Sequence, residues 1–96
     1  DTGLILPLGD WVLGEACRRA AELLRHQDLL IAINLSAVQV RRPGLAERVA
    51  DWLSAYGIPP SALELEVTES VLMDDSDVVS ETFSQLREMG VPLAID

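Results

Sequence analysis

The sequence predicts an α/β fold in which about three parallel strands alternate with three helices, as in part of a TIM-like (β/α)8 barrel. Short apolar runs alternate with segments whose apolar residues recur at helical spacing. Polar residues end the three expected strands at regular intervals of 32 residues (34 to 66) and 30 residues (66 to 96): Asn34, Glu66 and Asp96. About 30 residues is the length of one strand–helix unit, so each helix can return the chain to a neighbouring parallel strand.

Composition limits the classes of partner. The 96 residues suffice for one small domain, and a hydrophobic content of 49% favours a packed chain over a disordered one. The formal net charge of −9 disfavours electrostatic binding to a nucleic acid polymer or an anionic membrane. The same charge fits carboxylates that are neutralised by a cation or by a basic partner.

The single cysteine, Cys17, has no partner within the chain for a disulfide, so we expect a reducing, cytoplasmic compartment. Its surroundings are apolar, and we expect a small interior residue rather than a nucleophile. No apolar run approaches the roughly 20 residues of a membrane span, so this segment predicts no membrane contact, although other domains could anchor a longer parent. The start at Asp1 and the end at Asp96, within an expected strand, predict an internal piece of a longer chain.

The first helix is expected over residues 7–26. A lead-in with a turn at Thr2–Gly3 precedes it, and Pro7 suits its first turn. Its apolar residues include Leu8, Val12, Ala16 and Ala20, with Trp11 beside them, and His26 would complement the helix dipole at the C-terminal end. Trp11 here and Trp52 on the second helix are expected to pack in the interior.

The remaining elements follow from apolar patterning and from turn residues. Gly57 and Pro59–Pro60 end the second helix, and Gly90 ends the third. Acidic residues at 74, 75 and 77 are expected to cap the third helix. The expected order is a strand at 29–35, a loop with one helical turn at 37–44, a helix at 44–56, a strand at 62–67, a loop at 70–75, a helix from about 76 to 89 and a strand at 92–96.

The central strand carries carboxylates. Alternation places Leu63, Leu65 and Val67 on one face and the two carboxylates Glu64 and Glu66 on the other. Parallel strands are usually buried on both faces, and an unpaired buried charge is costly, so these groups need a metal ion or a basic residue. Glu64, which lies earlier in the strand, is expected to meet an arginine.

The carboxyl ends of parallel strands meet at one edge, where α/β proteins bind ligands. Asn34, Glu66 and Asp96 would gather there, because neighbouring strands lie about 4.8 Å apart. Two carboxylates and an amide carbonyl suit Mg²⁺, Mn²⁺ or Ca²⁺. Alternatives remain open: Asn34 could simply cap the next turn, and Arg41 and Arg42 could either reach a phosphate or form a solvated pair.

Three motifs in this order resemble the EAL-domain cyclic di-GMP phosphodiesterases of bacteria. They are Asn34-Leu35-Ser36 with Gln39, the segment Glu66-Val67-Thr68-Glu69-Ser70, and Leu93-Ala94-Ile95-Asp96. The segment from Leu8 to Leu13 also resembles the stretch that follows the name-giving motif of the family. The resemblance covers essentially the whole chain and implies a modified (β/α)8 barrel of about 250 residues, of which residues 1–96 are an internal part, incomplete at both ends.

The resemblance implies metal-dependent hydrolysis of cyclic di-GMP to the linear dinucleotide. It assigns Mg²⁺ or Mn²⁺ to Asn34, Glu66 and Asp96, with Glu66 and Asp96 as catalytic residues. Glu69 would support the loop that shapes the site and the interface of a homodimer. Candidate substrate contacts are Ser36, Gln39 and Arg41.

One departure weakens the resemblance. Val38 lies where many relatives carry a basic residue, so one substrate contact is expected to be missing. The name-giving EAL motif, the second Asp of the last motif, and a later Lys and Glu lie outside these 96 residues. A catalytically inactive EAL domain, acting as a cyclic di-GMP receptor or as a protein-interaction module, is therefore the alternative.

Overall fold

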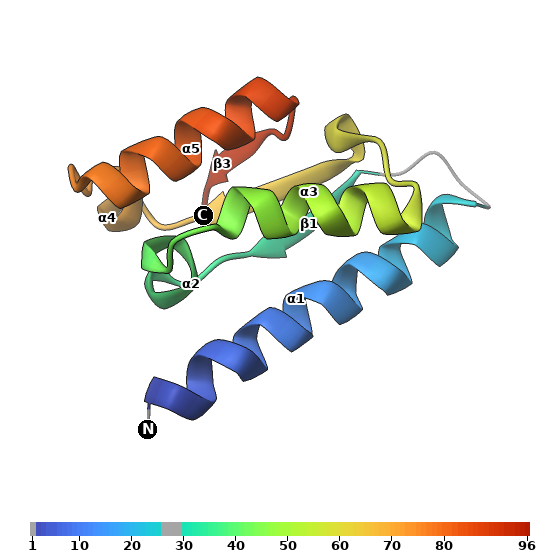
Figure 1. Cartoon of the computed structure of the whole chain (residues 1–96). Coiled ribbons are helices and arrows are strands. Elements are labelled where there is room, and N and C mark those ends of the chain that lie inside the picture. The colour runs from blue at the N-terminus through green and yellow to red at the C-terminus, as the bar shows by residue number, and fades with distance from the viewer. Residues whose placement is uncertain (1, 26–29) are drawn as a thin grey trace.

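The computed structural model describes residues 2–25 and 30–96 and shows a three-stranded parallel sheet with helices between the strands (Figure 1). The strand order is β1-β2-β3, and both neighbouring pairs are parallel. The predicted α/β class and its three parallel strands are confirmed. The elements are α1 (Thr2–Leu24), β1 (Ile31–Asn34), α2 (Ala37–Arg41), α3 (Leu45–Tyr56), the 3₁₀ turn η1 (Pro60–Ala62), β2 (Leu63–Val67), α4 (Glu69–Leu72), α5 (Asp77–Met89) and β3 (Leu93–Ile95).

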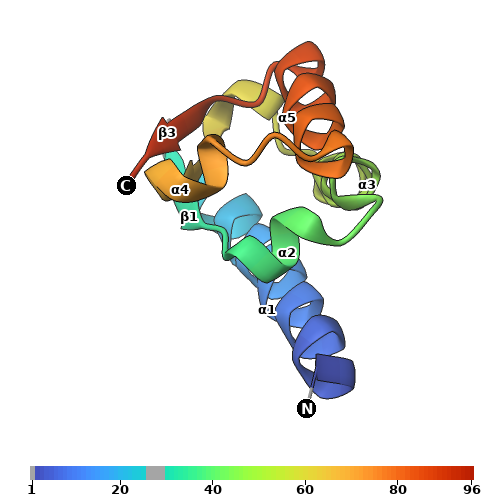
Figure 2. The same cartoon turned by 90° about the vertical axis from the view of Figure 1, so that its left-hand side faces the viewer.

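The core lies between the sheet and α3 and α5, which run side by side across one of its faces (Figures 1 and 2). Leu63, Leu65 and Val67 of β2 point to this face and are buried. Glu64 and Glu66, on the opposite face, are only half-buried. The expectation that both faces are buried is therefore wrong for this chain, because its helices cover one face alone.

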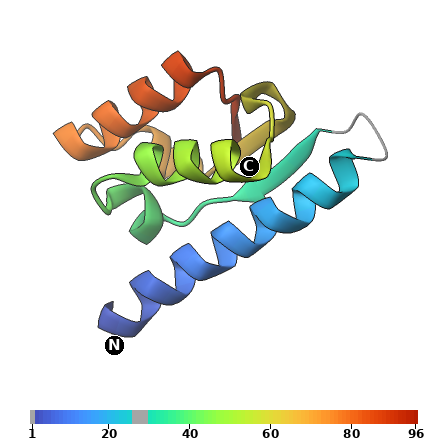
Figure 3. The same ribbon diagram turned by 45° about the vertical axis from the view of Figure 1, so that its right-hand side comes forward.

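Helix α1 packs along α3 and β1, and its N-terminal end extends past the other elements (Figures 2 and 3). The closest approach is at Gly14, where an added Cβ would lie 2.9 Å from Nε1 of Trp52. Glycine at this position lets the two helices meet at van der Waals distance. None of the described helices is both long and apolar enough to cross a membrane.

The buried stripe of α1 differs from the predicted one. Leu13, Cys17 and Ala20 are buried, whereas Trp11 is 65% and Val12 53% exposed, so the predicted packing of Trp11 is wrong. Apolar residues surround much of this helix, and its contact with α3 selects the stripe that is buried. The interior position of Cys17 is confirmed.

Both ends of α1 also depart from expectation. The predicted turn at Thr2–Gly3 is wrong, since α1 already begins at Thr2. The capping role of His26 and the start of the first strand at Leu29 fall outside the described residues.

The later helix ends agree with the sequence. Gly57 follows α3 and Gly90 follows α5, each with a left-handed backbone (φ of 67° and 88°), as expected for residues that terminate helices. The loop predicted at 70–75 is wrong in part, because α4 occupies Glu69–Leu72. Thr68 caps this short helix by accepting a hydrogen bond from the Val71 amide at 3.4 Å, and four residues are too few for a periodic pattern.

Candidate functional site

Asn34 and Glu66 lie side by side at the carboxyl ends of β1 and β2. They are partners in the parallel ladder, which continues one residue further where the Leu35 amide donates to the Glu66 carbonyl at 2.8 Å. Side chains at paired positions of neighbouring strands share a face of the sheet. Both side chains therefore belong to the face opposite the helices.

Asp96 extends this arrangement across β3. Glu66 pairs with Ala94, and the Asp96 amide donates to the Val67 carbonyl at 2.9 Å, so the chain stays in register beyond the strand. Because side chains alternate, Asp96 shares the face of Ala94 and hence of Glu66, two residues nearer the edge. The C-terminus lies at the same end of the sheet as α2 and α4 (Figure 1).

Each of the first two strands leads into a short capped helix. Ser36 accepts a hydrogen bond from the Gln39 amide at 3.2 Å, and the Gln39 side chain accepts one from the Ser36 amide at 2.9 Å, which together form a capping box. Thr68 has the same role for α4. The cap after β1 is therefore Ser36, and the alternative that Asn34 caps this turn does not hold.

The three candidate substrate contacts all make contacts within the protein. Ser36 and Gln39 form the capping box, and Gln39 Nε2 also donates to the Gly9 carbonyl at 3.3 Å. Arg41 donates from Nε to Asp74 Oδ2 at 2.9 Å. Their contact with a substrate stays a prediction.

Arg41 and Arg42 are not a solvated pair, as the sequence had suggested. Arg41 is paired with Asp74, and Arg42 donates to Asp10 on α1. Arg48 Nε lies 3.2 Å from the same Asp10 carboxylate. These partners are more than 30 residues apart in sequence and lie on different elements, so no local pattern indicates them.

Asp74 is more tightly held than its neighbours. Its Oδ1 accepts a hydrogen bond from the Ser76 amide at 2.9 Å, and Ser76 in turn caps α5 by accepting from the Val79 amide. The Ser76 amide, and then Arg41, lower the pKa of the Asp74 carboxyl from its ordinary value. The predicted acidic cap of α5 is thus divided: Ser76 is the N-cap, Asp74 supports it, and Asp77 lies in the first turn.

Glu69 and Glu64 have simpler surroundings. Glu69 is exposed in the first turn of α4, where a negative charge is favourable. Glu64 is half-buried on the open face of β2, and no ion pair to it is formed within the part of the chain that the structure describes. The predicted arginine partner of Glu64 is therefore not among the described residues.

The donor set fits a hard divalent cation but does not complete its coordination. Asn34, Glu66 and Asp96 offer an amide carbonyl and two carboxylates on one face of the sheet. Within residues 2–25 and 30–96, no three His, Cys, Asp or Glu side chains converge on one point. Mg²⁺ requires about six oxygen ligands, so further protein groups or waters would have to complete the shell.

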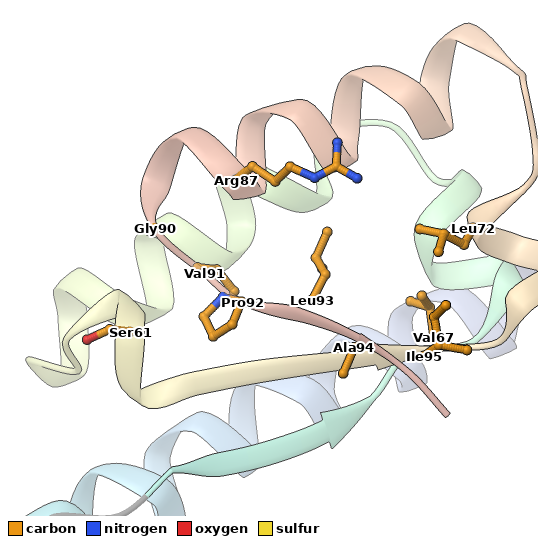
Figure 4. A pocket seen from close by; sticks show the side chains of 10 residues that line it. All are labelled: Ser61, Val67, Leu72, Arg87, Gly90, Val91, Pro92, Leu93, Ala94 and Ile95. Atoms are coloured by element: carbon orange, nitrogen blue, oxygen red, sulfur yellow. The ribbon is translucent and has the colours of Figure 1, made fainter.

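A groove beside β3 is chemically different from this edge. Val67, Leu72, Val91 and Leu93 give it an apolar lining, and the Arg87 side chain extends over it from α5 (Figure 4). No carboxylate lines it. The groove therefore does not provide ligands for a hard cation, and the candidate site is the strand edge.

Comparison with known proteins shows the family. The model of the EAL domain matches residues 1–96. The chain is 46% identical over 97 residues to the bifunctional diguanylate cyclase/cyclic di-GMP phosphodiesterase MucR of Pseudomonas aeruginosa, covering 99% of this chain and 14% of that protein. It is 40% identical over 99 residues to the signaling protein YkoW of Bacillus subtilis, covering all of this chain and 12% of that protein. The chain thus spans a small part of these relatives.

The fold matches solved structures as well. A structure described as the PaMucR phosphodiesterase in complex with c-di-GMP superimposes with a TM-score of 0.87 at 46% identity, covering 99% of this chain and 41% of that chain. The EAL domain of Mycobacterium smegmatis DcpA gives a TM-score of 0.81 at 34% identity, covering 94% of this chain and 42% of that chain. From the family match over its full length and from these superpositions, we conclude that the chain belongs to the EAL domain family.

Proposed function

We propose that this chain supplies the metal-binding strand ends of a phosphodiesterase that hydrolyses cyclic di-GMP to the linear dinucleotide. The observation that carries the proposal is the register of the sheet, which aligns Asn34 with Glu66 and continues in step to Asp96 on one face. Relatives named as cyclic di-GMP phosphodiesterases, including MucR and NbdA of Pseudomonas aeruginosa, support the substrate.

The proposed ligands are Asn34, Glu66 and Asp96, and the proposed ion is Mg²⁺ or Mn²⁺. Such an ion, when bound, polarises a phosphate oxygen and lowers the pKa of a coordinated water. The ion also accounts for how a chain with a net charge of −9 binds a substrate that is itself anionic. The residues of the chain hold the cation and fix the edge of the sheet on which the phosphate would lie.

The open face of β2 provides a matched control for the role of Glu66. Glu64 lies two residues earlier on the same strand and the same face, and both carboxylates are half-buried. Glu64 pairs with Ala32 rather than with Asn34, which removes it from the strand edge. A loss of activity that is specific to position 66 would therefore reflect the strand end rather than a carboxylate anywhere on this face.

The test is hydrolysis of cyclic di-GMP by the intact protein with Mg²⁺ or Mn²⁺, compared with its Glu66→Gln and Glu64→Gln variants. We expect turnover in the unmodified protein and in Glu64→Gln. Glu66→Gln should lose more than the roughly 10- to 100-fold that is typical of an outer-shell partner of a metal ligand. Full activity of Glu66→Gln would refute the proposed ligand set.

A receptor without activity is the second candidate, and Val38 favours it. This apolar side chain is 46% exposed on α2, close to the strand edge, where a basic residue would attract a phosphate. Binding of cyclic di-GMP without turnover by the intact protein would identify a receptor. Neither binding nor turnover would indicate a protein-interaction module.

A further inference from the structure

The positions of the two central candidate ligands depend on two short helices. Asn34 is followed two residues later by Ser36, the N-cap of α2, and Glu66 is followed two residues later by Thr68, the N-cap of α4. Both helices lie at the same end of the sheet (Figures 1 and 2). A shift of either helix would therefore move the strand end that precedes it.

One ion pair joins the segments that carry these helices. Arg41 is the last residue of α2, and Asp74 follows α4. Arg41 Nε donates to Asp74 Oδ2 at 2.9 Å, across 33 residues of sequence. Among the described residues, this is the only hydrogen bond between side chains that connects the segment after β1 with the segment after β2.

Both partners are fixed by independent contacts. Helix α2 is tied to α1, because Gln39 donates to the Gly9 carbonyl and Arg42 donates to Asp10. Asp74 is tied to the start of α5, because its other carboxylate oxygen accepts from the Ser76 amide at 2.9 Å. The Arg41–Asp74 pair therefore connects two anchored segments rather than two free side chains.

We propose that Arg41 and Asp74 are a positioning pair that sets the spacing between the Asn34 and Glu66 strand ends. This inference rests on the proposed metal site, and neither residue is proposed to touch the substrate. It assigns Arg41 a different role from the direct phosphate contact that the sequence suggested, because its Nε is directed at Asp74 and not at the open face.

The test is a double-mutant cycle in the intact protein with Arg41→Gln, Asp74→Asn and the double variant. Asp74→Asn keeps an oxygen for the Ser76 amide, so it removes the Arg41 contact while preserving the support of α5. Arg19→Gln is the matched control, since Arg19 is 74% exposed and lies 3.9 Å from its nearest acidic partner. Two quantities are measured for each variant: the Mn²⁺ dissociation constant by calorimetry, and hydrogen exchange of amides 35–42 and 68–76.

We expect Arg41→Gln and Asp74→Asn each to raise the Mn²⁺ dissociation constant by about two- to fivefold, the range for loss of an exposed ion pair. The double variant should be no weaker than either single variant, and exchange should accelerate in both segments. Arg41→Lys should recover part of the loss, and Arg19→Gln should match the unmodified protein.

Two results would overturn the inference. In the first, Arg41→Gln weakens cyclic di-GMP binding while Asp74→Asn does not, which would make Arg41 a substrate contact. In the second, exchange in the two segments is unchanged or the effects of the single variants multiply in the double variant. Hydrogen exchange requires neither metal nor turnover, so it decides on the pair even if the unmodified protein proves inactive and the proposed function fails.

Discussion

Asn34 and Glu66 occupy paired positions of the β1–β2 ladder, at the point where both strands end. Their side chains share the face that the helices of this chain leave open. The residue two positions after each is the hydroxyl cap of a short helix, Ser36 in one case and Thr68 in the other. The two strand ends are thus built in the same way, and this likeness relates the local sequence to the proposed metal site.

Asn34 is exposed, and Ser36 caps the turn in its place, so Asn34 should matter for the metal rather than for the fold. We expect Asn34→Leu to raise the Mn²⁺ dissociation constant by at least about tenfold, the lower range for disturbing a metal site. Asn34→Asp keeps an oxygen donor and should bind Mn²⁺ at least as well as the unmodified protein. Calorimetry measures both, and a large loss of thermal stability in Asn34→Leu would instead assign Asn34 a structural role.

Two glycines of α1 should respond oppositely to the same substitution. Gly14→Ala should lower the free energy of unfolding by about 1–3 kcal/mol, because its Cβ would overlap the rigid Trp52 ring. Gly9→Ala should raise it by about 0.5–1 kcal/mol, because its Cβ would lie at an ordinary 3.6 Å from the Gln39 side chain and alanine favours helix. Denaturant unfolding of the two variants measures the difference, and stabilisation by both would contradict the close approach of α1 and α3.

The Cys17 thiol should be unreactive in the native protein. Cys17 is fully buried, and burial raises its pKa to about 11, so thiolate is scarce at neutral pH. We expect no labelling of Cys17 by iodoacetamide at pH 8 without denaturant and complete labelling after unfolding. Mass spectrometry of the peptide that contains residue 17 measures the fraction, and rapid native labelling would show that α1 separates from α3.

The Arg41–Asp74 pair should make stability depend on pH in one direction. The folded protein lowers the pKa of Asp74, so the carboxylate binds a proton more weakly when folded than when unfolded. Its contribution is present above the unfolded pKa of about 3.9 and is lost as the pH falls through the lower folded value. The melting temperature of the unmodified protein should exceed that of Asp74→Asn at pH 6, and the difference should close towards pH 2.5. A gap that widens on acidification would contradict this assignment.

The sequence predicts the sheet and the candidate ligands because both depend on short-range order. Alternation identifies β2, and equal spacing of Asn34, Glu66 and Asp96 follows from repeated strand–helix units. The capping box of α2 is likewise contained in four residues. These features require no knowledge of which elements touch, and the structure reproduces the strands and their parallel pairing.

The remaining features depend on tertiary contacts. The exposure of Trp11 follows from the face that α1 presents to α3, and the apolar residues around this helix do not select that face in advance. The partners of Arg41 and Arg42 lie 33 and 32 residues away, beyond any local pattern. Helix α4 was missed because four residues cannot display a helical period, although Thr68 followed by Glu69 is a recognisable start.

The central claim is that Asn34, Glu66 and Asp96 hold one divalent cation. Anomalous diffraction from crystals of the intact protein with Mn²⁺ tests it most directly. The account predicts a peak at about 2.0–2.3 Å from a side-chain oxygen of each of these three residues. A Mn²⁺ peak coordinated by other residues, with Asn34 and Glu66 both outside its coordination shell, would contradict it.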